Sequence, residues 1–148
     1  MLSGCAFGAA NANVAPAPTY DPALPFPVPA SCPQPSYLNV SILPERMRQT
    51  TMFWIGSDTL AVGHIRGTVW RSGENAVAWW SADGEPTIEM NLLEGKTAPP
   101  SVTFQRAALP LYPSVLVLPQ NGCWEIIATA GAQRLRFLMY VYPARFVP

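Results

Sequence analysis

Charged side chains are scarce in this chain of 148 residues: they make up 12% of it, about half the share of an average soluble domain. Nine basic and nine acidic residues give a net charge of +0, whereas a surface that binds nucleic-acid phosphates needs a clustered excess of Lys and Arg. Nucleic acid is therefore not an expected partner. Because a free surface normally carries more charge, we expect part of it to be covered by a membrane, an assembly or the chain itself.

Long apolar runs are also lacking. The longest candidate, residues 109–119, is interrupted by Pro110 and Pro113, and it falls short of the roughly 18–20 residues of a membrane-spanning helix. Apolar residues nevertheless reach 49% of the chain, which excludes disorder along its whole length. The 17 prolines and 10 glycines leave few helix-forming runs and favour β-structure.

Residues that carry chemistry are few. His64 is the one histidine, so a Ser-His-Asp or Cys-His arrangement would depend on it, yet no nucleophile-elbow pattern accompanies it. The carboxylates that could pair as acid and base are expected to face outward from strands or loops: Glu85, Glu89, Glu94 and Glu125. The sequence contains no phosphate-binding loop, calcium loop or Cys/His cluster. We therefore predict a protein that is not an enzyme and has no catalytic residues, metal or cofactor.

The N-terminus carries a short pattern of its own, Leu2-Ser3-Gly4-Cys5. A hydrophobic residue and two small residues before a cysteine are typical of a bacterial lipobox, in which the thiol accepts a diacylglycerol; a chance match of four residues is the alternative. Met1 leaves no room for the basic and apolar parts of a signal peptide, so we expect a leader upstream of the printed start. Cys5 is thus the predicted lipidation site. It would anchor the protein to the outer face of a membrane in the bacterial cell envelope.

Residues 6–36 have the composition of a tether. Prolines recur from Pro16 to Pro35, fixing φ and removing backbone donors, so that neither a helix nor a sheet ladder can run through this stretch. Leu24, Phe26 and Val28 alternate with proline, however, and this apolar stripe could instead lie on the folded domain or on a partner. We predict a lipobox remnant at 1–5, a tether at 6–36 and a folded domain at 37–148.

The folded part divides into short β-like runs separated by turn residues, at a spacing of about 8–12 residues that is typical of a sandwich or barrel. A helical turn is expected at 44–49. The clearest hairpin joins the last two runs, whose apolar residues alternate. The expected strands are 37–42, 51–55, 59–62, 67–71, 76–81, 87–92, 101–105, 114–118, 123–130 and 134–142.

The cysteines fit an extracytoplasmic location. If Cys5 is lipidated, Cys32 and Cys123 remain as one pair, and two cysteines with a distant histidine do not make a tetrahedral metal site. Outside the cytoplasm this pair should oxidise to a disulfide.

Near the end of the chain, Pro119 is followed by Gly122-Cys123-Trp124-Glu125 and a closing hairpin, and the part that leads to this end opens with Cys32-Pro33. These features resemble a family of uncharacterised bacterial lipoproteins. Trp54, Gly56, Asp58 and Leu60 are similar to another segment of the family, and so is the pair Trp79-Trp80. Many members follow that pair with arginine where this chain has Ser81, which leaves no role to transfer at that position.

This resemblance, which covers the chain from Cys32 onward, implies an immunoglobulin-like antiparallel β-sandwich at 37–148 and a Cys32–Cys123 bridge. It brings no assigned activity.

Tryptophans are the remaining candidates for a binding surface. Trp79 and Trp80 are adjacent on an expected strand, so their rings point to opposite faces, and Trp70 raises the same question of what covers it. Such a ring could anchor a protein interface, stack on a sugar or lie under a loop or the tether. We expect a non-catalytic binding or structural accessory subunit of a membrane-associated or cell-surface assembly, with protein partners. The alternative is a carbohydrate- or cell-wall-binding domain that uses an exposed tryptophan.

Overall fold

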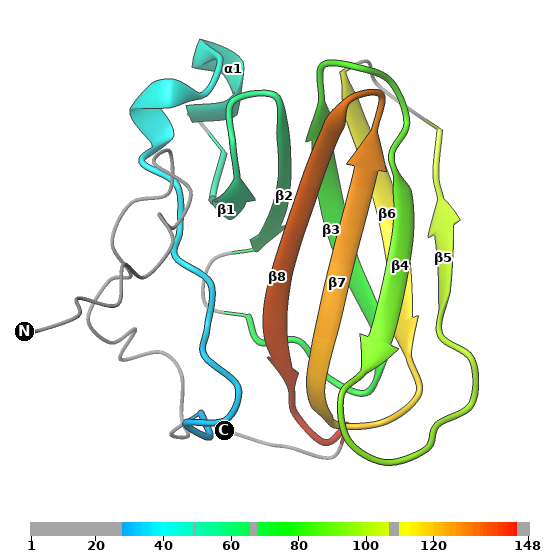
Figure 1. The fold of residues 1–148 in the computed structure, drawn as a ribbon. Coiled ribbons are helices and arrows are strands. Elements are labelled where there is room, and N and C mark those ends of the chain that lie inside the picture. Colours follow the sequence, from blue (N-terminus) through cyan, green and yellow to red (C-terminus); the bar gives the residue numbers. More distant parts are fainter. Residues whose placement is uncertain (1–27, 49, 66–67, 107–109, 145–148) are drawn as a thin grey trace, which may run out of the picture.

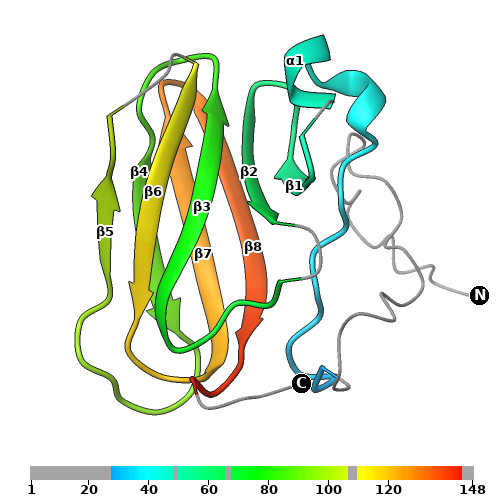
Figure 2. The same ribbon diagram turned by 180° about the vertical axis from the view of Figure 1, so that it is seen from behind.

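The computed structural model describes residues 28–48, 50–65, 68–106 and 110–144. These residues form two antiparallel sheets, one with strand order β1-β2-β3-β6-β5 and one with order β4-β7-β8. The two sheets lie face to face as the layers of a sandwich (Figures 1 and 2). The strands are β1 Met52–Gly56, β2 Leu60–Ile65, β3 Gly73–Ser81, β4 Thr87–Leu92, β5 Ser101–Phe104, β6 Leu111–Leu118, β7 Gly122–Ala130 and β8 Gln133–Val141. The expected all-β sandwich is confirmed.

The sequence correctly predicts eight of the strands, and the helical turn at 44–49 is found as α1, Glu45–Arg48. The strand expected at 37–42 is wrong. The Leu38 N–H donates to the Trp54 carbonyl at 2.7 Å, but the Asn39 side chain then accepts from the Ser41 N–H at 3.0 Å. This local bond starts a turn, and the chain continues as the 3-10 helix η1, Val40–Ile42.

The strand expected at 67–71 is also wrong over residues 68–71, the part of it that the structure describes, because no named strand includes them. The side chain of Asn75 accepts from the Arg71 N–H at 2.8 Å and donates to the Arg71 carbonyl at 2.7 Å. These two bonds satisfy the backbone N–H and carbonyl of Arg71, which a neighbouring strand would otherwise bind. Arg71 makes an isolated parallel bridge with Tyr142, outside the named strands. Cys5 and the tether up to residue 27 lie outside the described residues.

The main core fills the space between the two sheets. Trp79 from β3 and Trp124 from β7 are both fully buried in it. Each indole N–H has an acceptor: Trp79 donates to Ser114 Oγ at 3.0 Å, and Trp124 donates to the Gln120 carbonyl at 2.8 Å. The core therefore buries two large rings without leaving their polar atoms unpaired.

A second cluster lies on the outer face of the larger sheet. Trp54 and Trp80 share this face with the small residues Ala61, Gly63 and Ala78, which leave room for the indole rings. Residues 28–48, here called the N-terminal strap, cover it with three buried side chains: Leu38, Leu43 and Met47. Figure 1 shows the strap running on the β1 side of the larger sheet up to α1, which lies near β1. No helix among the described residues is long and apolar enough to cross a membrane.

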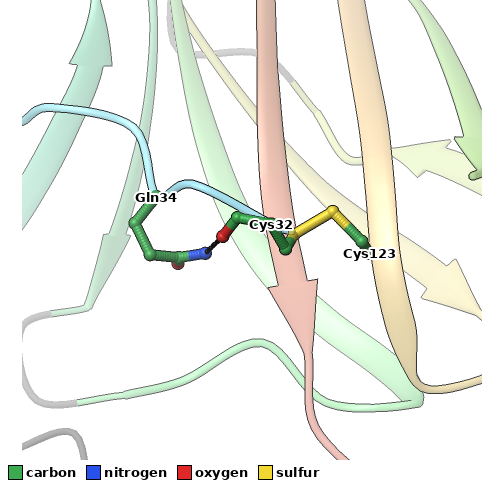
Figure 3. The surroundings of a disulfide bond; sticks show 3 residues. All are labelled: Cys32, Gln34 and Cys123. Atoms are coloured by element: carbon green, nitrogen blue, oxygen red, sulfur yellow. Dashed lines mark hydrogen bonds between the residues drawn. A yellow bond between two sulfur atoms is a disulfide. The ribbon is translucent and has the colours of Figure 1, made fainter. Parts of the chain in front are cut away.

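A disulfide between Cys32 and Cys123 ties the start of the strap to β7, as expected (Figure 3). The two Cα atoms are 5.6 Å apart, although 91 residues separate the cysteines in the sequence. The Gln34 amide donates to the Cys32 carbonyl at 3.2 Å and fixes the chain as it leaves the bridge. The strap is therefore held at both ends, by the disulfide and by the second cluster.

Replacing both cysteines, as in Cys32→Ala/Cys123→Ala, should lower the free energy of unfolding by about 4–5 kcal/mol, because the unfolded chain then gains the freedom of a long open loop. Urea titration of the variant and of the oxidised protein measures the difference. Chemical reduction of the unmodified protein should give a similar loss. Equal midpoints in all three samples would contradict the argument.

Gly63→Ala tests the fit of Trp54. A Cβ at Gly63 would lie 2.9 Å from three atoms of the Trp54 ring, closer than such contacts occur. We expect a loss of about 1–3 kcal/mol in unfolding free energy, because the ring must leave its place. In a Trp54→Leu background the same change should cost much less. An equal cost in both backgrounds would show that the ring is not the obstacle.

Candidate functional site

The three tryptophans expected at a binding surface are all buried. Trp79 is 0% exposed, Trp70 3% and Trp80 9%. The hypothesis of an exposed stacking platform is therefore wrong for the described surface. Trp70 and Trp79 lie in the main core, whereas Trp80, on the outer face of β3, packs in the second cluster with apolar side chains of the strap.

Trp80 and Trp70 are held by different contacts. The Trp80 N–H donates to the Asp58 carbonyl at 2.8 Å, which ties β3 to the β1–β2 turn. Trp70 meets Phe137 edge to face, with ring centroids 6.1 Å apart. The Trp70 carbonyl also accepts from the Tyr142 N–H at 2.8 Å, so its segment is fixed to the end of β8. Both rings contribute to packing between elements.

His64 lies on β2 and is 5% exposed. Its Nε2 is 3.2 Å from the Tyr37 hydroxyl, and the Tyr37 ring stacks on Phe53 with centroids 4.7 Å apart. These contacts join the strap to β1 and β2. Packing and hydrogen bonding therefore explain the buried position of His64.

The four carboxylates considered in the sequence are either paired with an arginine or exposed. Glu125 on β7 pairs with Arg136 on β8, whose Nε donates to it at 2.6 Å. Glu85, Glu89 and Glu94 are exposed. Within the described ranges, no group of three His, Cys, Asp or Glu residues could hold a metal ion.

Two of the hollows that described residues line open on the surface. One, of about 270 Å³, lies beside the disulfide and is lined by residues that include Glu94 and Tyr140. The other, of about 180 Å³, is lined by residues that include His64, Trp70 and Glu74. Both are smaller than the roughly 300–1,000 Å³ typical of small-molecule sites.

Sequence reasoning missed a different feature, the side of the sandwich where β4 and β5 end the two sheets. Apolar side chains on these strands are half-buried, and acidic residues flank β4. The alternation in residues 87–92 is visible in the sequence, but the position of this strand at an edge is not.

No family model and no curated protein matches the chain.

The phenol of Tyr142 has a shifted pKa. Burial raises the pKa of its phenol above the ordinary 10.0, and the neighbouring Tyr140 raises it further. The two rings meet at right angles, with centroids 5.0 Å apart. Folding therefore favours the neutral phenol.

The raised pKa gives a defined pH dependence. Above pH 10 the unfolded chain ionises Tyr142 while the folded chain keeps it neutral, so this part of the stability is present below pH 10 and is lost as the pH rises through the folded pKa. In Tyr142→Phe the alkaline loss of stability should be shallower. Urea titrations at several alkaline pH values measure it, with Tyr112→Phe as control. Equal slopes in the variant and the unmodified protein would contradict the assignment.

Proposed function

We propose that this protein is a non-catalytic binding module of the bacterial cell envelope, anchored to the outer face of a membrane through a lipid on Cys5. The observation that carries this proposal is the Cys32–Cys123 disulfide. Disulfides persist in oxidising compartments and are rare in the cytosol of most organisms. A bridge that holds the strap over the second cluster therefore favours an extracytoplasmic location.

The connectivity supports an immunoglobulin-like module. In constant-type immunoglobulin domains, strands A, B, E and D form one sheet, and C, F and G form the other. The order β2-β3-β6-β5 corresponds to the first sheet and β4-β7-β8 to the second, with β1 as an added edge strand. The bridge differs, because it joins the F-like strand β7 to the strap rather than to the B-like strand β3. Fold alone does not assign a function, so the binding role is argued from the surface.

The hollows, the charge and the buried tryptophans of the described residues support a role in protein interaction. The two hollows described above are small, and the chain carries little charge for a protein with a freely exposed surface. The carbohydrate-binding alternative required an exposed tryptophan, and all five tryptophans are buried: Trp54, Trp70, Trp79, Trp80 and Trp124. The described surface therefore favours a protein partner in an envelope assembly over a sugar.

The anchor is tested by expressing the chain in a bacterium with a lipoprotein leader joined ahead of Leu2. We expect the product to enter the detergent phase and to carry the mass of a diacylglycerol, because the Cys5 thiol is the acceptor. Cys5→Ala should abolish both, and Ser3→Ala should retain them, since a small residue remains before the cysteine. An unmodified Cys5 in the mature protein would overturn the anchor.

A further inference from the structure

The two sides of the sandwich differ in how their edges are covered. At one side the strap bonds to β1 through the Leu38 N–H, and residues 70–72 bond to the end of β8. At the other side stand β4 and β5, the end strands of the two sheets. In both views β5 lies farther from the centre of the sandwich than β4 does (Figures 1 and 2). Among the described residues, no segment pairs with the outer edge of either strand.

The backbone of β4 presents hydrogen-bonding groups along this edge. The Leu93 N–H donates to the Cys123 carbonyl at 2.9 Å, which continues the β4–β7 register. In an antiparallel pair, alternate residues face the same neighbour, so residues 87, 89 and 91 bond to β7. The N–H and C=O groups of Ile88, Met90 and Leu92 therefore point to the free edge. The unpaired N–H and C=O groups of these three alternate residues can bind the backbone of an added strand.

Apolar side chains at this edge are incompletely covered. Ile88 and Leu92 on β4, and Val102 and Phe104 on β5, pack against the main core but remain half-buried. Because the smaller sheet stops at β4, the inner face of β5 lacks a strand opposite it (Figure 1). A strand added beside β4 would lie over β5 and cover these side chains.

The charge along β4 has one sign. Asp83, Glu85, Glu89 and Glu94 are all exposed, and residues 83–95 contain no Lys or Arg. Two copies pairing through β4 would bring Glu89 close to acidic residues of the other copy, which is unfavourable. A basic strand would instead find opposite charges on its outer face.

We propose that the β4 edge binds an extended segment of a partner protein in which basic and apolar residues alternate. The basic residues would lie beside Thr87, Glu89 and Asn91 on the outer face. The apolar residues would cover Ile88, Val102 and Phe104 on the inner face. This inference rests on the proposed binding function and names the surface and the chemistry of the partner.

The test uses an eight-residue peptide of alternating Lys and Val with blocked ends, added to the oxidised full chain. We expect saturable binding and slowed amide hydrogen exchange at Ile88, Met90 and Leu92. Glu89→Lys should weaken binding about fivefold or more, because an opposite-charge cross-strand pair becomes a like-charge pair. Glu45→Lys, an exposed charge reversal on α1, should leave the affinity unchanged.

N-methylated peptides separate strand addition from attraction between charges. Methylation at the valines blocks the donors used in antiparallel pairing, and methylation at the lysines blocks those used in parallel pairing. We expect one of these two peptides to lose binding. Equal binding of both, no protection of β4, or an unchanged affinity in Glu89→Lys would each overturn the proposal.

The outcomes also separate this inference from the proposed function. A lipidated Cys5 together with a peptide that fails to bind would retain the envelope module and reject β4 as its docking edge. An unmodified Cys5 together with protected β4 amides would reject the anchor and retain the docking edge.

Discussion

The structure depends on a constraint set by two adjacent residues, Trp79 and Trp80. Neighbouring side chains on a strand point to opposite faces, so two tryptophans in a row require both faces of β3 to be buried. The second sheet covers Trp79, and the strap covers Trp80. A two-layer sandwich would satisfy only one of them. The strap is therefore a third layer over part of the larger sheet rather than a loose leader to the domain.

The third layer explains how the disulfide contributes to the fold. The strap contains only short helices, η1 and α1, which would be unstable alone. Its position relies on Leu38, Leu43 and Met47 in the second cluster and on Cys32 at its start. The bridge joins the strap to β7 in the smaller sheet, whereas the second cluster lies on the larger one. The strap thus links the two sheets along one side. This covering also accounts for part of the low surface charge, since the chain buries one of its own apolar faces.

Much of this architecture could be predicted from the sequence. Alternation and turn residues located eight strands, and the residues of β4 were predicted without error. The two false strands have β-like composition, but side-chain bonds of Asn39 and Asn75 to the backbone redirect the chain there. The pattern also placed Trp79 and Trp80 on opposite faces of a strand but gave no sign of what covers the outer ring, because the covering residues are tens of positions away. The β4 edge was missed for a similar reason: strand order depends on the long-range pairing of β3 with β6.

The asymmetry between the two sides of the sandwich follows from the order of its strands. The larger sheet has five strands and the smaller has three, so the two cannot cover each other completely. At one side the strap compensates for the difference, with help from the Tyr142–Trp70 backbone bond. At the other side, no segment of the described part of the chain covers β4, and exposed acidic residues lie along it. Like charges at an edge oppose pairing between identical copies, which protects an open edge from aggregation. The same charges favour a basic strand, so one arrangement both prevents self-association and selects a partner.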